Sequence, residues 1–213
     1  REPLGVVASI LAFNLPLAHA AQKAAPAIAA GNAVILKPST DAPLTVLRLG
    51  LLLYRAGMPP EALSILTGKG EELGHALAAH PLVQMLTFTG SREVGLNLPA
   101  HAGAKRIEME LDTVGVLIAC ASADPEQVAE QITCCAFTMA GQLPSSIQHV
   151  WAHQSLYEPL TAALVDQATH LKTGDPMDEH VSLAPLIHPH ALTRVAQWVD
   201  DACKGGARAL TGG

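Results

Sequence analysis

Short apolar stretches alternate along the chain with longer stretches in which apolar residues recur at helical spacing or alanine predominates. Breakers such as Gly31, Gly57 and Pro59 separate the two kinds of stretch. The pattern predicts strands over residues 5–13, 33–37, 63–67, 85–89, 105–111, 114–119 and 149–152. It predicts helices over residues 16–30, 42–56, 71–79, 125–137, 156–170 and 190–204, and a short helix from residue 93 that Pro99 ends or kinks.

The alternation of strand and helix with short connections calls for a mostly parallel sheet that helices cover on both faces. We therefore expect the α/β fold class, with a doubly wound sheet followed by a second α/β domain fragment. The chain contains no internal repeat and no low-complexity segment.

Composition narrows the classes of partner. Apolar residues make up 49% of the chain and charged residues 15%, which favours a compact fold over disorder. The net charge of -6 argues against nucleic acid or an anionic membrane as the main partner. No apolar run reaches the roughly 18 residues that span a membrane, and no signal peptide is recognised.

The four cysteines form no Cys-x-x-Cys pair, so neither a zinc site nor a disulfide framework is indicated, and we expect a cytoplasmic protein. The chain begins with Arg1 and ends with Gly-Gly, and we expect it to be a segment of a longer protein. The polar region that holds His180, His188 and His190 has no compact metal-ligand spacing, and we expect a solvated loop and no metal.

A series of short motifs runs through the chain in a fixed order. The motifs are Glu2-Pro3-Leu4-Gly5-Val6, Phe13-Asn14-Leu15-Pro16, Ala29-Ala30-Gly31-Asn32, Lys37-Pro38-Ser39, Gly57-Met58-Pro59-Pro60, Phe88-Thr89-Gly90-Ser91, Glu110-Leu111 and Gly141-Gln142. Each is weak alone, but their order and spacing together resemble the aldehyde dehydrogenase superfamily across essentially the whole chain.

The resemblance implies two parts with different roles. Residues 1–111 would form the NAD(P)-binding domain, a variant of the Rossmann fold, and residues 112–213 the first half of the catalytic domain. The family reaction is the NAD(P)-dependent oxidation of an aldehyde to a carboxylic acid. A nicotinamide dinucleotide is therefore the expected partner, and any homo-oligomer would form through parts outside this chain.

Two glycine-containing turns are candidate phosphate sites. Residues 68–74 read Gly-Lys-Gly-Glu-Glu-Leu-Gly between a predicted strand and a predicted helix, where backbone N–H groups can hold a phosphate. An ordinary tight turn explains this pattern equally well. After the next strand, Gly90 permits close backbone approach, and Ser91 is either a plain N-cap or a cap that also meets a phosphate oxygen.

Lys37 ends a predicted buried strand, where a charge needs a reason. By resemblance it contacts the adenosine ribose, although a side chain that reaches solvent from the strand end is the alternative. The family's frequent acidic residue three positions later is Thr40, which neither binds a ribose hydroxyl strongly nor repels a 2′-phosphate. The cofactor can therefore be NAD or NADP, with a slight preference for NADP. The full set of residues that the resemblance assigns to the cofactor is Leu11, Phe13, Asn14, Lys37, Ser39, Thr40, Gly70, Gly74, Phe88, Gly90, Ser91, Val94 and Leu111.

The family chemistry assigns catalytic roles to three positions. Asn14 matches the asparagine whose side-chain amide stabilises an oxyanion, and an Asn-x-Pro turn is the alternative. Glu110 matches the glutamate that activates water, and a solvated strand-end carboxylate is the alternative. The family has Gly-Gly after Glu-Leu, whereas this chain has Asp112-Thr113, so we expect side chains and a like charge to disturb Glu110.

The third position carries the nucleophilic cysteine in the family, one residue after Gly-Gln, and here it is Pro144. Proline offers neither a thiolate nor a backbone N–H for the oxyanion, so we expect no aldehyde dehydrogenase activity. Ser145 and Ser146 have no assignable base, and we expect Cys134 and Cys135 to be buried, inert thiols. Two alternatives remain: a non-enzymatic docking or subunit-contact domain with a vestigial cofactor site, and an active oxidoreductase that uses another residue.

Overall fold

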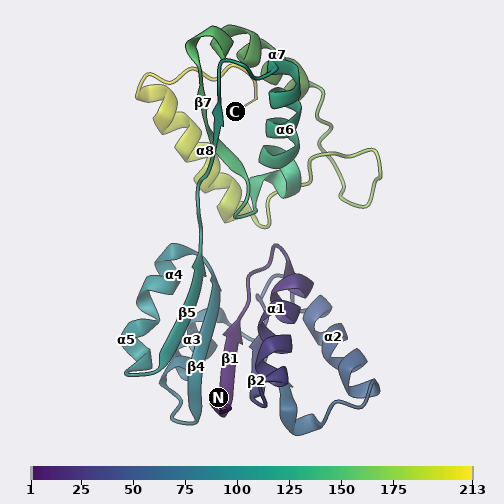
Figure 1. The fold of residues 1–213 in the computed structure, drawn as a ribbon, viewed down its shortest axis with the longest axis vertical. Coiled ribbons are helices and arrows are strands. Elements are labelled where there is room, and N and C mark those ends of the chain that lie inside the picture. Colours follow the sequence, from purple (N-terminus) through teal and green to yellow (C-terminus); the bar gives the residue numbers. More distant parts are fainter. Residues whose placement is uncertain (1, 213) are drawn as a thin grey trace. The chain divides into compact units, whose positions relative to one another are not determined.

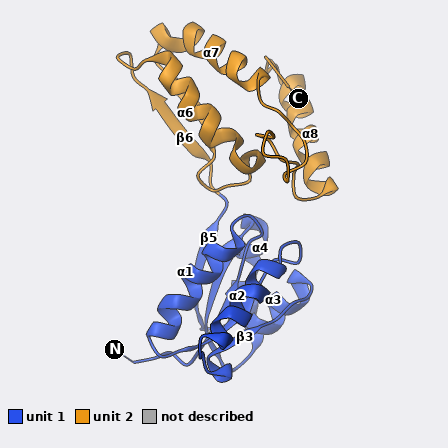
Figure 2. Ribbon diagram, turned by 90° about the vertical axis from the view of Figure 1, so that its right-hand side faces the viewer, with its two compact units in different colours: residues 1–112 blue, residues 113–213 orange. Residues whose placement is uncertain are grey.

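The structure, a computed structural model, describes residues 2–212 and consists of two compact units, residues 1–112 and residues 113–213 (Figure 2). Each unit has its own strands, helices and buried core. The two units are described one at a time below.

The first unit is built on a five-stranded sheet in the order β3-β2-β1-β4-β5, and all four strand pairs are parallel. The strands are β1 (Val6–Ile10), β2 (Ala33–Lys37), β3 (Leu63–Ile65), β4 (Val83–Gly90) and β5 (Arg106–Leu111). The chain starts at the centre, moves outward through β2 and β3, and then crosses to the other side of β1. The predicted doubly wound parallel sheet is therefore confirmed.

Helices cover both faces of this sheet, as Figure 1 shows. The helices α1 (Pro16–Ala29) and α2 (Leu44–Arg55) lie on one face, and α3 (Gly70–Ala79), α4 (Arg92–Asn97) and α5 (Pro99–Ala102) lie on the other. A short 3-10 helix, η1 (Pro60–Ala62), precedes β3. The predicted break at Pro99 separates α4 from α5, because proline lacks the N–H that would continue the hydrogen-bond ladder.

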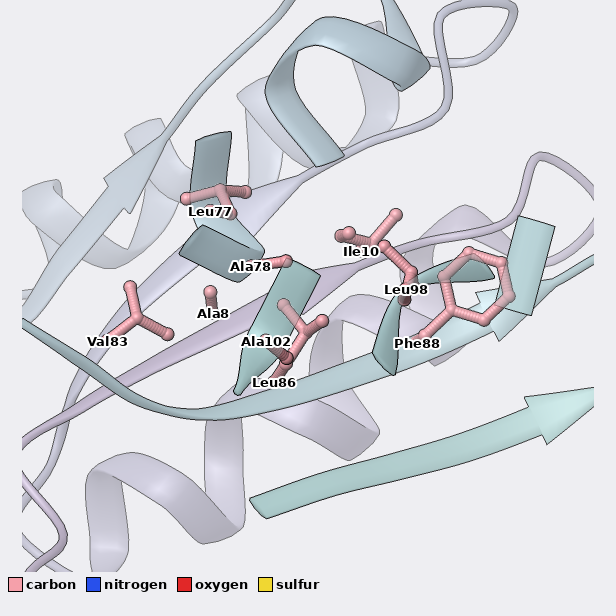
Figure 3. Close-up of a cluster of buried hydrophobic side chains, with 9 residues drawn as sticks. All are labelled: Ala8, Ile10, Leu77, Ala78, Val83, Leu86, Phe88, Leu98 and Ala102. Atoms are coloured by element: carbon pink, nitrogen blue, oxygen red, sulfur yellow. The ribbon is translucent and has the colours of Figure 1, made fainter. Parts of the chain in front are cut away.

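Side chains that alternate along the strands supply one apolar layer on each face. The cluster in Figure 3 joins Ala8 and Ile10 of β1 and Leu86 and Phe88 of β4 to Leu77 of α3, together with further members Ala78, Val83, Leu98 and Ala102. On the opposite face, the cluster under α1 and α2 contains Leu11, Ala20, Ala24, Val34, Leu36, Val46 and Leu63. The strands β1, β2 and β4 are thus largely buried on both sides, whereas exposed and half-buried residues alternate along β5.

The second unit contains a two-stranded parallel sheet of β6 (Gly115–Ala119) and β7 (Ile147–Ala152). Between the strands run α6 (Pro125–Phe137) and the irregular turn η2 (Thr138–Gly141), and η3 (Gln154–Leu156), α7 (Tyr157–Thr169) and α8 (Pro189–Lys204) follow β7. Asp124 begins α6 by accepting the N–H groups of Glu126 and Gln127 on its carboxylate. The core of this unit is Ala119, Ala129, Ile132, Leu156, Leu160 and Ala163.

The cysteines correct one expectation. Cys134 and Cys135 were expected to be buried, and both are exposed. The buried side of α6 carries Ala129 and Ile132, three residues apart, and the two cysteines fall on the other side of the helix. Within residues 2–212, no helix is long and apolar enough to span a bilayer.

Candidate functional site

The carboxyl ends of the parallel strands gather most of the predicted site residues at one edge of the first unit. Asn14 follows β1, Lys37 ends β2, Ser91 follows β4 and Glu110 is the second-to-last residue of β5. Ligands of open α/β sheets bind outside this edge, where the strand order reverses. Here the order reverses between β1 and β4.

A cavity of about 600 Å³ lies beside this point of reversal, lined by the ends of β1 and β4 and by α3, α4 and α5. Six of the predicted cofactor residues line it: Leu11, Gly70, Gly74, Phe88, Ser91 and Val94. The others, Phe13, Asn14, Lys37, Ser39, Thr40, Gly90 and Leu111, are not among its lining residues. The volume lies in the range of pockets that take a drug-sized ligand.

Lys37 is only 3% exposed, so its side chain does not extend to solvent as the alternative interpretation required. A Cβ atom built on Gly70, the first residue of α3, would lie 3.8 Å from the Lys37 Nζ atom, which puts the ammonium beside that helix start. Burial lowers the pKa of the Lys37 ammonium below its ordinary value, and the charge of Asp41 opposes that change. A buried cation with a depressed pKa is stabilised by any anion that reaches it.

The turns around the cavity are held by their own side chains. Thr40 donates its hydroxyl hydrogen to the Gly68 carbonyl at 3.2 Å, and the Ser39 hydroxyl accepts the Asp41 N–H at 3.3 Å. Ser91 accepts the Val94 N–H at 3.4 Å, so it caps α4, as both interpretations predict. At Gly90, a Cβ atom would lie 2.7 Å from the Phe88 ring, so any larger residue would require that ring to shift.

Two imidazoles form one wall of the cavity. The rings of His75 in α3 and His101 in α5 stack with centroids 4.0 Å apart and planes 15° apart. Both residues line the cavity, as do the acidic residues Glu71 and Glu93. Glu71 lies within the predicted turn at residues 68–74, and His75 and Glu93 lie just after the two glycine-containing turns, but none of the three was singled out. No sequence signal pointed to His101.

Glu110 has defined partners, and its side chain is also 54% exposed, as the strand-end alternative predicts. Its Oε2 atom accepts the Thr89 hydroxyl at 2.7 Å and lies 3.3 Å from the ammonium of the buried Lys23 in α1. The Thr89 hydrogen bond lowers the pKa of Glu110 below its ordinary value; burial opposes this, and Lys23 adds to the lowering.

The expected disturbance from the two residues that replace Gly-Gly is not visible in the backbone. Among residues 2–212, only Met139 and Ala140 are non-glycine residues with positive φ, so Asp112 and Thr113 adopt ordinary conformations. The carboxylate of Glu110 is held by Thr89 and Lys23 despite the nearby Asp112.

Asn14 is held through its side-chain oxygen. Oδ1 accepts the backbone N–H of Leu15 at 3.1 Å, and Nε2 of His19 lies 3.1 Å from the same oxygen. His19 is 6% exposed, in the first turns of α1. Burial lowers the pKa of His19, while Glu110 raises it and Lys23 lowers it further.

The two buried polar residues of α1 that contact Asn14 and Glu110 were not identified from the sequence. Lys23 and His19 are four residues apart on one face of the predicted helix over residues 16–30, and both are buried. A charge and an imidazole on the buried face of an alanine-rich helix are a signal that polar partners lie opposite. The partner strand positions are Thr89 and Glu110, which the sheet register sets directly opposite each other.

In the second unit, Pro144 lies in a turn that the Ser146 N–H closes onto the Leu143 carbonyl at 3.0 Å. Its carbonyl accepts the Thr113 hydroxyl at 2.7 Å. Ser146 is 1% exposed and donates its hydroxyl to the Ala136 carbonyl at 3.1 Å, so it is engaged structurally. His149 lies on β7, as expected.

Metal ligation finds no support in the arrangement of side chains. Within the described part of the chain, no three His, Cys, Asp or Glu residues are grouped so as to hold a metal ion. Nδ1 of His188 accepts the Ala191 N–H at the start of α8.

Comparison with known proteins places this geometry in a family. The family model described as the aldehyde dehydrogenase family matches residues 1–213. A 3-sulfolactaldehyde dehydrogenase of Priestia aryabhattai is 38% identical over 213 residues, which cover 100% of this chain and 45% of that protein. The chain thus spans somewhat less than half the length of that curated relative.

Solved structures agree with the sequence match. An aldehyde dehydrogenase C mutant from Pseudomonas syringae, complexed with NAD+ and octanal, superposes with a TM-score of 0.96 at 34% identity, covering 100% of this chain and 44% of that chain. A glyceraldehyde-3-phosphate dehydrogenase from Methanocaldococcus jannaschii, complexed with NADP, gives a TM-score of 0.95 at 34% identity, covering 100% of this chain and 47% of that chain. The chain therefore belongs to the aldehyde dehydrogenase family.

Proposed function

We propose that this chain is the NAD(P)-binding domain, residues 1–111, and part of the catalytic domain, residues 112–213, of an aldehyde dehydrogenase-like oxidoreductase that has lost its catalytic activity. The first unit binds a nicotinamide dinucleotide weakly, in the cavity beside β1 and β4. The family reaction, oxidation of an aldehyde to a carboxylic acid, does not run because Pro144 replaces the nucleophile. The observation that carries this proposal is the identity of residue 144.

The cavity supports the binding half of the proposal. Its lining combines apolar residues of β1 and β4 with polar residues on α3, α4 and α5, and cofactor sites likewise join an apolar surface to placed polar groups. The buried ammonium of Lys37 lies beside the first residue of α3, where a phosphate or a ribose oxygen would compensate its charge. The bound dinucleotide would supply the hydride acceptor. Two similar proteins, by their descriptions, hold NAD+ and NADP.

The residues that remain could serve only part of the chemistry. Asn14 can donate amide hydrogens to a developing oxyanion, and Glu110 can accept a proton from water. The lowered pKa of Glu110 makes it a weaker base than a glutamate whose pKa is raised towards neutrality.

The proline at position 144 removes both the nucleophile and one hydrogen-bond donor to the oxyanion. Without a thiolate no covalent bond to the aldehyde carbon forms, and without an N–H one oxyanion donor is missing. The loss of one such donor costs a factor on the order of 10²–10³ in turnover. The neighbouring Ser146 hydroxyl is buried and bonded to Ala136, so it offers no substitute.

Titration of the full-length protein with NAD+ and with NADP+ by calorimetry tests the binding half. We expect dissociation constants on the order of 1 mM. Lys37→Met should weaken binding about ten- to hundredfold, because a hydrogen bond to a charged group contributes about 1.5–3 kcal/mol. Lys204→Met, the same change at an exposed lysine paired with Asp201, is the control and should leave binding unchanged.

The alternatives are outcomes of the same experiment. Failure of both dinucleotides to bind in the millimolar range would support a docking or subunit-contact domain with a vestigial site. The exposure of Cys134 and Cys135 bears on the other alternative, an active enzyme that uses another residue. If the full-length protein oxidises aldehydes and Cys134→Ala or Cys135→Ala abolishes that activity, this alternative replaces the proposal.

A further inference from the structure

A buried histidine stands behind Asn14 with a role that the motifs do not assign. His19 lies five residues after Asn14, and its Nε2 atom is 3.1 Å from Asn14 Oδ1. The identity of the Asn14 atom that faces His19 is settled independently of His19, because the backbone N–H of Leu15 points to the same atom at 3.1 Å. A flipped carboxamide would set an NH₂ group against that N–H donor, so the atom is the oxygen.

An amide oxygen only accepts hydrogen bonds, so Nε2 of His19 must carry a hydrogen. The other ring nitrogen, Nδ1, is buried and has no hydrogen-bond partner within the described residues. A proton on Nδ1 would leave a buried N–H unsatisfied and would set the Nε2 lone pair against the lone pairs of Oδ1. The groups with charge that act on the ring are Lys23 of α1 and Glu110 of β5, and they act in opposite directions.

We infer that His19 is a neutral histidine protonated on Nε2 and that it is a positioning residue, which fixes the side-chain amide of Asn14 as a hydrogen-bond donor of set direction. Two donors on one oxygen define the plane of the carboxamide. The direction of the Nδ2 hydrogens follows from that plane. The Asn14 amide is therefore preorganised to donate to a developing negative charge. His19 acts only through Asn14 and does not contact that charge itself.

The use of this donor for an oxyanion rests on the proposed function, whereas the tautomer and the fixed amide do not. The first experiment is therefore spectroscopic. Full-length protein labelled with ¹⁵N-histidine gives ring nitrogen signals, and His19 is assigned by the signals that disappear in His19→Gln. We expect a protonated Nε2 and an unprotonated Nδ1 at pH 7. A protonated Nδ1, in either the other tautomer or an imidazolium, would overturn the inference.

The second experiment compares crystal structures of His19→Gln and His19→Leu. Glutamine keeps an N–H donor at similar reach, and leucine fills the same space without one. The Asn14 carboxamide should keep its orientation in His19→Gln and rotate or become disordered in His19→Leu. An unchanged, ordered Asn14 in the leucine variant would show that His19 does not position it.

A functional readout separates this inference from the proposed function. His19→Gln should leave dinucleotide affinity unchanged in the calorimetric titration, because it keeps an N–H donor to Asn14, which the resemblance assigns to the cofactor. If Pro144→Cys gains aldehyde turnover, adding His19→Leu should lower kcat by up to the 10²–10³-fold cost of a lost oxyanion donor, with KM changing less, and His19→Gln should recover it. If neither dinucleotide binds, the proposed function fails, and the ring signals and crystal structures still decide the role of His19.

Discussion

The carboxylate of Glu110 is held in its charged form by two partners from different elements. Thr89, opposite it on β4, donates a hydrogen bond of 2.7 Å, and the ammonium of Lys23 lies 3.3 Å away. Lys23 is itself buried, and an isolated ammonium there would be costly, so the pair explains why a lysine is tolerated on the inner face of α1. The same contacts that stabilise the carboxylate reduce its strength as a base.

Thr89→Val should make stability depend less steeply on pH below pH 4.5. The folded-state pKa of Glu110 is depressed below 4.5, mainly by Thr89, so its contribution to stability is full above pH 4.5 and is lost as the pH falls through the folded pKa. Without the Thr89 hydroxyl the folded pKa rises towards 4.5, so less stability depends on the charged carboxylate and the loss below pH 4.5 is smaller. Urea unfolding of the full-length protein from pH 3 to pH 7 measures this, with Thr169→Val, an exposed threonine on α7, as the control. Superimposable pH profiles for wild type and Thr89→Val would contradict the assignment.

At the scale of elements, the turn between α6 and β7 holds the two non-glycine residues with positive φ among residues 2–212. Met139 and Ala140 adopt φ of 53° and 55°, and Gly141 follows at 73°. Consecutive left-handed residues are unfavourable for all but glycine. Pro144 suits the turn that follows, since its ring presets the φ of the second residue of a β-turn.

Replacing Ala140 with glycine should stabilise the protein. The left-handed conformation costs an alanine about 1–2 kcal/mol, and the extra unfolded-state freedom of glycine offsets about 0.4–1 kcal/mol of that. We expect a net gain of about 0.5–1 kcal/mol in the free energy of unfolding, measured by denaturant titration. Ala162→Gly, in the exposed middle of α7, should instead lose about 1 kcal/mol. Equal losses for both variants would show that residue 140 is not left-handed.

The sheet could be predicted from the sequence, whereas the polar contacts beneath it could not. Residues 33–37 form a short apolar run bounded by breakers, which is the pattern typical of a buried parallel strand. The strand β2 has the predicted bounds. The pairing of Lys23 with Glu110 spans 87 positions, and no local pattern predicts such a contact. The exposure of Cys134 and Cys135 was mispredicted because cysteine is usually buried, whereas here the apolar positions of α6 lie on its other side.

At the scale of the whole molecule, the comparisons show the family, whereas catalytic activity depends on a few individual side chains. The fold and the motif order extend over the entire chain, and the match covers 45% of a curated relative. A fold of this kind hosts chemistry only through particular side chains, so membership of the family does not by itself imply turnover. Asn14 and Glu110 are present with defined partners, and the decisive position is Pro144.

Aldehyde oxidation by the full-length protein tests the central claim most directly. The protein is incubated with NAD+ or NADP+ and a panel of small aldehydes, and the reduced cofactor is followed by its absorbance. We predict no cofactor reduction above the protein-free control in the wild type, because Pro144 offers neither a thiolate nor an N–H. Pro144→Ser is the matched variant that restores the N–H without a thiolate, and it should also be inactive. Reduction of cofactor by the wild-type protein in proportion to its concentration would contradict the account.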